Sequence, residues 1–261
     1  MAIDLNALRA KHEQLSNPKA AAGGNNQDFL NKFYRVLEGD NYVRILPAAE
    51  GSDKPFYAET KIHRVPDGQG GVRNYHCRKV HGEKCPMCEL YYALWKTGVK
   101  EDEDLARQIK PRSRYYLNIL DRNTDEVKIF SIGMILFQKI METMLDPDYA
   151  DLFEKAENGI LDTKIGHDFK VSMFKEGQWP KYDRSMFRPR GSELGSAQQV
   201  DEVMNSLHDI HDLVKLEEYD TLMEAAQNLR PELGVVRERP APTQETPESG
   251  SDDDFTRRLM S

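Results

Sequence analysis

The sequence lacks the features that would suggest a secreted or membrane-spanning protein. Only three of its 261 residues are cysteine, an odd number that cannot all pair as disulfides within one chain. No apolar run approaches the roughly 20 residues that cross a bilayer, and the N-terminus has no apolar core typical of a signal peptide. We therefore expect a cytoplasmic protein without a membrane partner, in which clustered cysteines bind metal more often than they form disulfides.

Familiar catalytic motifs are also absent. The sequence contains neither a G-x-x-x-x-G-K-[ST] phosphate loop nor an H-E-x-x-H motif. His208 and His211 could bind a metal together with neighbouring aspartates, but a solvated acidic helix face explains this cluster better. We predict a protein that is not an enzyme. The alternative is a zinc-containing nuclease or another nucleic-acid-processing enzyme. A zinc-containing regulator of duplex DNA is less favoured, because it would need a basic recognition helix, which the sequence does not provide.

The net charge of −8 conceals an uneven distribution of charge. Residues 61–84 carry six lysines and arginines against two acids, residues 105–120 carry four against none, and residues 165–192 carry six against three. Residues 193–232 reverse this balance, with ten acids against two basic residues. A basic middle of this kind is typical of a protein that binds nucleic acid.

The pattern of composition predicts three parts. Residues 1–25 form an N-terminal arm with a short amphipathic stretch, and residues 26–232 form a folded core that ends in an acidic helical region at 193–232. Residues 233–261 are rich in proline and acids, so we expect a disordered acidic C-terminal tail.

Short apolar segments within the core predict a mainly β protein with helices, of the α+β class. The expected strands are residues 41–47, 56–63, 114–121, 126–133 and 168–174, of which the third and fourth form a hairpin. The expected helices are residues 86–97 and 134–145, with an acidic helical pair at 198–229. Short strands at uneven spacing with a few helices favour a small β-barrel with insertions, such as the oligonucleotide/oligosaccharide-binding (OB) barrel.

The most specific motif is "HCRKVHGEKCPMC", at residues 76–88. Cys85 and Cys88 form a CxxC pair, whose two thiolates can bind one tetrahedral ion while the following helix anchors them. Cys77 supplies a third sulfur. Ligand sets of this kind favour one structural Zn²⁺, so we predict a zinc module embedded in the core at residues 61–97.

The fourth zinc ligand is less evident from spacing alone. We favour His63, because it ends an expected strand and the turn at 66–71 can return the chain toward Cys77. His76 and His81 remain alternatives, although His76 should point to the opposite face of its strand from Cys77.

Basic and aromatic residues alternate in the same segments, as a binder of single strands requires for phosphates and bases. Strand alternation should place one of two adjacent tyrosines in the core and the other toward a ligand. The candidate DNA-binding residues are Arg44, Tyr75, Lys110, Arg112, Arg114, Tyr115, Tyr116, Trp179, Tyr182 and Arg184.

The chain resembles the helix-destabilising single-stranded DNA-binding proteins of T-even-like bacteriophages. The resemblance covers roughly residues 26–230. It is carried, in the family's order, by "YVRILP", "KPFYAETKIH", "CRKVHGEKCPMCELY", "KPRSRYYLNIL" and "QWPKYDRSMF". It implies an OB barrel with an embedded zinc module, liganded by one histidine and three cysteines, with DNA in a cleft between module and barrel. It places the counterparts of Arg44, Lys110, Tyr115, Tyr116, Trp179 and Tyr182 at or near that cleft.

The resemblance also implies a function. Such a protein coats transient single strands during phage DNA replication, recombination and repair, with little sequence preference, and destabilises duplex by mass action. We therefore expect self-association along DNA through the N-terminal arm. We also expect replication and recombination proteins to bind the acidic tail, all in the cytoplasm of the infected bacterial host.

Overall fold

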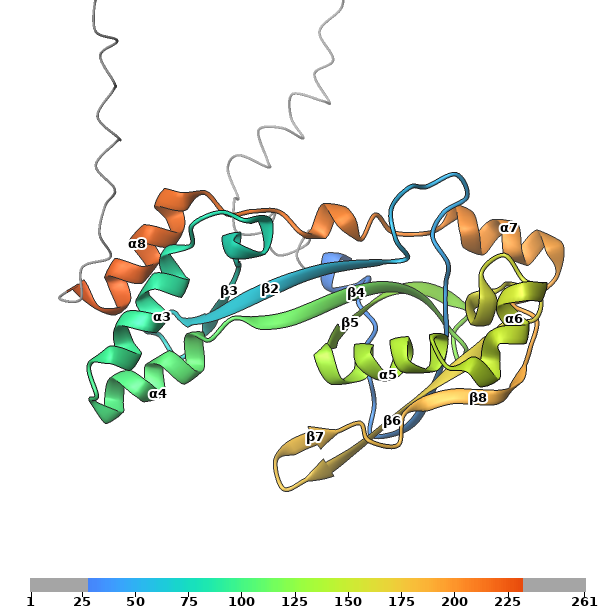
Figure 1. Cartoon of the computed structure of the whole chain (residues 1–261), viewed down its shortest axis with the longest axis horizontal. Coiled ribbons are helices and arrows are strands. Elements are labelled where there is room, and N and C mark those ends of the chain that lie inside the picture. The colour runs from blue at the N-terminus through green and yellow to red at the C-terminus, as the bar shows by residue number, and fades with distance from the viewer. Residues whose placement is uncertain (1–27, 232–261) are drawn as a thin grey trace, which may run out of the picture.

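The computed structural model of this chain describes residues 28–231 (Figure 1). The predicted arm at 1–25 and the predicted tail at 233–261 lie outside the described residues, so both stay predictions. Within the described range, no helix combines the length and apolar character needed to cross a membrane.

The fold is built on an eight-stranded antiparallel sheet. The main path runs β3-β2-β4-β1-β6-β7, while β5 pairs with β4 and β8 pairs with β6. The predicted α+β class is confirmed, and so is the expected hairpin, which is β4 and β5. The predicted OB barrel is not confirmed, because the strands described here form an open sheet. The strands are β1 (Gly39–Ile45), β2 (Tyr57–Pro66), β3 (Val72–His76), β4 (Arg112–Asp121), β5 (Glu126–Gly133), β6 (His167–Glu176), β7 (Trp179–Lys181) and β8 (Met186–Gly191).

Helices lie at both ends of this sheet, and α5 and α7 pack on its opposite faces (Figure 1). The predictions at 86–97 and 134–145 are confirmed, and so is the acidic helical pair expected at 198–229, which is α7 and α8 separated by residues 206–218. The longer helices are α3 (Pro86–Lys96), α4 (Lys100–Ile109), α5 (Met134–Met144), α6 (Ala150–Lys155), α7 (Ala197–Asn205) and α8 (Tyr219–Leu229). The sequence analysis missed α4, whose buried face consists of little more than Ala106 and Ile109.

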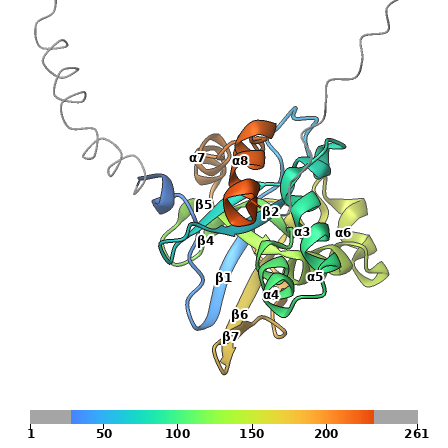
Figure 2. The ribbon, with the colours of Figure 1, turned by 90° about the vertical axis from the view of Figure 1, so that its left-hand side faces the viewer.

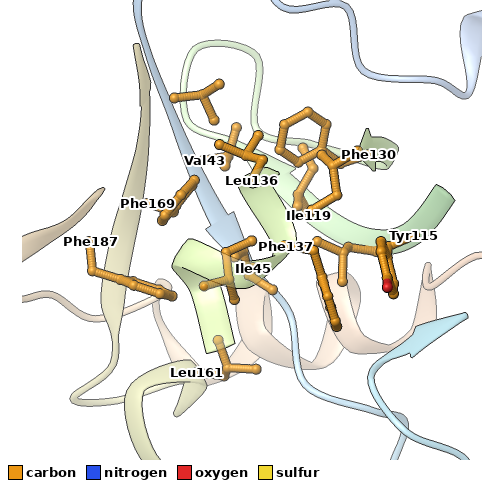
Figure 3. Packing of buried hydrophobic residues seen from close by; sticks show 14 of the residues in the cluster. Val43, Ile45, Tyr115, Ile119, Phe130, Leu136, Phe137, Leu161, Phe169 and Phe187 are labelled. Carbon is orange, nitrogen blue, oxygen red and sulfur yellow. The ribbon is translucent and has the colours of Figure 1, made fainter. Parts of the chain in front are cut away.

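The main core lies between the sheet and α5 (Figure 3). Alternate residues of β4 point into it, and Tyr115 stacks on Phe137 of α5 with ring centroids 3.8 Å apart and planes 7° apart. Because side chains of a strand alternate between faces, the odd-numbered residues of β4 define what we call the core face of the sheet.

A second apolar cluster forms a lobe at the other end of the sheet. Leu90 and Leu94 of α3 pack there with Ala106 and Ile109 of α4 and with Met223 of α8. Figure 2 shows α8 beside α3 at this end of the molecule. The last helix of the acidic C-terminal region, α8, is therefore part of the folded core of this lobe, which we call the cysteine lobe, whereas α7 packs in a separate cluster with Leu46 and Leu120.

The irregular segment 206–218, which we call the strap, runs between α7 and α8 (Figure 1). Asn118 of β4 fixes it by donating to the His208 carbonyl and accepting from the His208 backbone N–H. The ring Nε2 atoms of His208 and His211 lie 3.2 and 3.1 Å from the carbonyl oxygens of Val127 and Pro55. Through these contacts the two imidazoles help to hold the strap in place.

Candidate metal centre and nucleic-acid interface

Four side chains from three parts of the chain meet inside the cysteine lobe. His63 comes from β2, Cys77 follows β3, and Cys85 and Cys88 lie at the start of α3; all four are buried. The β2–β3 hairpin turns at Asp67, whose Oδ1 accepts from the backbone N–H groups of Gln69 and Gly71. This turn lets β3 return antiparallel to β2 and carries Cys77 back to His63.

The distances within this cluster match a tetrahedral metal site. Cys77 Sγ lies 3.5 Å from Cys88 Sγ, and His63 Nε2 lies 3.5 Å from Cys85 Sγ and 3.6 Å from Cys88 Sγ. All four ligand atoms lie within 4.8 Å of one another. A tetrahedral zinc ion, with bonds of about 2.3 Å to sulfur and about 2.0 Å to nitrogen, separates its ligands by roughly 3.5–3.8 Å. The residues present therefore fit such an ion.

The His63 ring is oriented by a backbone group at the end of α4. Its Nδ1 lies 2.7 Å from the carbonyl oxygen of Ile109, which can only accept, so Nδ1 carries the proton. Nε2 is then left with its lone pair facing the sulfurs. A hydrogen bond to the ring nitrogen that does not bind metal is the usual support of a ligating histidine.

Without a cation, hydrogen bonds within the cluster shift the pKa values of its side chains. Burial opposes protonation of His63, but hydrogen bonds with Cys77 and Cys85 outweigh it and raise the pKa of the imidazole to about 9. Hydrogen bonds with Cys77 and Cys88 lower the pKa of the Cys85 thiol. A bound cation would displace the proton from His63 Nε2 and stabilise the thiolates, because thiolates and neutral imidazole are the forms that bind metal.

The structure separates His63 from the two alternative histidines. His76 lies on the opposite face of the β2–β3 hairpin, with Nδ1 2.9 Å from the hydroxyl oxygen of Thr60. His81 is exposed at the end of a 3-10 turn, Arg78–His81. His63 is therefore the histidine that joins the three cysteines.

Among the candidate DNA-binding residues, Arg44 lies in the interior rather than on a surface, with 1% of its side chain exposed. Its Nε donates to Asp168 Oδ1 at 2.9 Å, Nη1 donates to the Asp162 carbonyl, and Nη2 donates to the carbonyl and hydroxyl oxygens of Ser192. Arg122 also contacts Asp168. This burial corrects the expectation of a DNA contact at Arg44, because no side of the guanidinium faces solvent.

Tyr115 and Tyr116 point to opposite faces of β4, as strand alternation predicts. Both rings are 7% exposed. Tyr115 belongs to the main core, and its hydroxyl donates to Glu59 at 3.3 Å. Tyr116 packs under Phe33 on the other face, with ring centroids 6.4 Å apart. Neither ring is open enough to stack fully on a base in this conformation.

The other predicted residues are exposed or half-buried. Arg112 and Arg114 share the face of Tyr116, and Lys110 is exposed at the end of α4. Trp179 on β7 is 68% exposed, whereas Tyr182 is half-buried against the main core. The remaining two are Arg184, exposed over the Phe174 ring, and Tyr75, half-buried in the cysteine lobe.

The sequence analysis missed Arg64, which lies on β2 beside the predicted arginines. The signal was present in "KIHRVP", where His63 and Arg64 must point to opposite faces of a strand. Only the pairing of β2 with β4 shows that Arg64 and Arg112 share a face.

These observations define an antiparallel α+β protein with a buried His–Cys₃ cluster that can bind metal and with several solvent-facing arginines. Residues 37–231, about three quarters of the chain, match a family model described as gp32 DNA binding protein like. The chain belongs to this gp32-like family of DNA-binding proteins, which confirms the resemblance seen in the sequence. A search of curated proteins gave no match.

Proposed function

We propose that this protein coats transient single-stranded DNA with little sequence preference, during phage DNA replication, recombination and repair. The observation that carries the proposal is the family match, which spans the metal cluster and the whole described sheet. Exposed cations at Lys110, Arg112 and Arg184 supply charge for phosphates, and Trp179 supplies a stacking surface. Preferential binding of single strands lowers the free energy of the melted state, so duplex is destabilised without ATP.

Zinc is the ion that we propose for the His63–Cys77–Cys85–Cys88 cluster, because three thiolates and one imidazole in tetrahedral arrangement favour it. When bound, zinc would link β2, the segment after β3 and the start of α3. With four protein ligands, such an ion would have no open position for a reactive water. Among residues 28–231 this is the one group of three or more histidine, cysteine or acidic side chains that could bind a metal ion.

Two further parts of the proposal concern segments outside the described residues. The arm at 1–25 would mediate self-association along DNA, and the acidic tail at 233–261 would bind replication and recombination proteins. The basis is the family resemblance and the acidic sequence "SDDDF" at 251–255. The proposed location is the cytoplasm of an infected bacterium.

The first test is a comparison of single-stranded and duplex DNA of one sequence, by fluorescence titration at two salt concentrations. We expect a strong preference for the single strand. The affinity should fall steeply with salt, because each neutralised phosphate of a single strand contributes a slope of about −0.7 in log K against log salt. Sequence-specific duplex binding of higher affinity, or cleavage of the DNA with Mg²⁺, would contradict the proposal.

The second test concerns stacking at Trp179. Trp179→Ala should weaken single-strand binding by roughly 1–3 kcal/mol while leaving the salt slope unchanged, because a stacked base releases few counterions. Trp179→Phe should restore much of the affinity. The matched control is Trp95→Ala in α3. The guanidinium carbon of Arg107 already lies 5.3 Å from the centroid of the Trp95 ring. Equal affinities for wild type and Trp179→Ala would exclude this residue from the interface.

A further inference from the structure

A cavity of about 630 Å³ opens on the face of the sheet opposite the core face. Three arginines line one side of it: Arg64 from β2, and Arg112 and Arg114 from β4. Phe29 and Phe33 line the other side, with Tyr116 contributing from β4. We call this the arginine pocket. No residue of β6, β7 or β8 lines it, so it is separate from the hairpin that carries Trp179.

Strand register places the three guanidinium groups on one face. Ile62 lies opposite Arg112 and Thr60 lies opposite Arg114 in the β2–β4 pairing. Arg64 follows Ile62 by two residues, so its side chain points to the same side of the sheet. His63, between them, points to the other side and into the metal cluster. The pairing that builds the metal site therefore also gathers the arginines.

Within residues 28–231, these arginines have no carboxylate partner. No ion pair within 4.0 Å is formed by Arg64, Arg112 or Arg114 with any acidic group in residues 28–231. Arginines elsewhere in the fold do have such partners: Arg107 pairs with Glu103 and Asp104, and Arg230 pairs with Asp102. Clustered guanidinium groups repel one another, and an anion that bridges them removes this repulsion.

The apolar side of the pocket further restricts the kind of ligand that can bind there. Phe29 is 43% exposed and meets Phe33 edge to face, with ring centroids 5.3 Å apart. Phe33 in turn packs on Tyr116. A ligand that fills the pocket therefore needs both negative charge and a flat or apolar group. A nucleotide unit of a single strand has both, because its phosphate matches the guanidinium fork and its base can contact an aromatic ring.

We propose that the arginine pocket is a second contact region for single-stranded nucleic acid, in which Arg64 and Arg112 bind backbone phosphates and Phe29 and Phe33 contact a base. This inference rests on the proposed function. It extends the proposed DNA-binding surface to a second face of the sheet and to a further residue, Arg64. A strand that reaches both the pocket and Trp179 contacts more nucleotides than either region could bind alone.

The test is the salt dependence of binding to an oligothymidylate of about 12 nucleotides, within the usual range of site sizes. Arg64→Ala/Arg112→Ala should lower the affinity at low salt on the order of tenfold, and should reduce the salt slope by about 1.4, the loss of two phosphate contacts. Lys155→Ala/Lys164→Ala, which removes two exposed cations outside the pocket, is the control and should change the slope less.

The possible outcomes separate this inference from the proposed function. If wild-type protein does not bind the oligonucleotide, the proposed function fails. If wild type binds and the Arg64→Ala/Arg112→Ala variant keeps its affinity and slope, only the arginine pocket is excluded. If the variant keeps its oligonucleotide affinity but loses binding of a peptide of residues 245–261, the pocket binds acidic peptide and the inference is overturned.

A second measurement uses the unaltered protein and so does not depend on the folding of a variant. Irradiation of wild type with an oligonucleotide that contains 4-thiothymidine should cross-link the peptide around Phe29 and Phe33. Cross-links confined to the peptide around Trp179 would overturn the inference.

Discussion

Cys88→Ser should abolish metal binding and unfold much of the cysteine lobe. The wild-type protein should contain about one zinc ion per chain after gentle purification, and the variant should contain none. Apparent zinc-binding free energies in small zinc modules are about 10–16 kcal/mol at neutral pH, comparable to the whole stability of a typical domain. Metal analysis and calorimetry would measure both effects, and hydrogen exchange should show lost protection first in α3 and α4, which pack around the cluster.

Histidine variants test the ligand set independently of the cysteines. His63→Ala should weaken zinc binding, because it removes the nitrogen 3.5 Å from Cys85 Sγ. His81→Ala is the control, since its ring is exposed outside the cluster, and it should retain the metal with unchanged affinity. Retention of zinc by His63→Ala together with its loss from His81→Ala would contradict the geometry described above.

Arg44→Ala should destabilise the fold by roughly 3–5 kcal/mol, the usual cost of removing one partner of a buried ion pair. The substitution leaves Asp168 with Arg122 as its one remaining ion-pair partner among the described residues, and removes the Arg44 donors to the Asp162 and Ser192 carbonyls. We expect a lower midpoint in urea with an unchanged slope of free energy against denaturant.

The same variant separates a structural role from a DNA contact. At a temperature where Arg44→Ala is still folded, its salt slope for single-stranded DNA should equal that of wild type, because Arg44 reaches no phosphate. Arg184→Ala provides the opposite control: it removes an exposed cation and should leave stability nearly unchanged. A reduced salt slope for Arg44→Ala with wild-type stability would restore Arg44 to the DNA-binding surface.

Local sequence patterns were sufficient for the features that depend on neighbouring residues. The spacing of Cys85 and Cys88 and the proline at the start of α3 predicted a metal-binding knuckle followed by a helix, because both depend on a single turn of chain. The alternation of Tyr115 and Tyr116 predicted that they point to opposite faces, since every strand alternates. The short stretches that resemble those of phage single-stranded DNA-binding proteins indicated the family, because each can be recognised without its partners in the fold.

Such local patterns could not predict whether the sheet closes into a barrel. The positions of most strands could be predicted, but the OB barrel required strands distant in sequence to pair around a circle. The described strands pair instead in an open order from β3 to β7. Strand pairing depends on contacts between segments tens of residues apart, and hydrophobic periodicity carries no information about the choice of partner.

The sequence by itself therefore determined the cysteine ligands, the class of fold and the family, because each is encoded in residues close together or in a series of short stretches. Only the tertiary structure decided which histidine joins the cysteines, since His63 reaches them through the return of β3 along β2. It also decided the roles of the arginines. Arg44 is buried because Asp168, 124 residues away, pairs with it, while Arg64 lies beside Arg112 at the surface because β2 pairs with β4. The sequence gives the charge of a side chain, but long-range packing determines which group it pairs with.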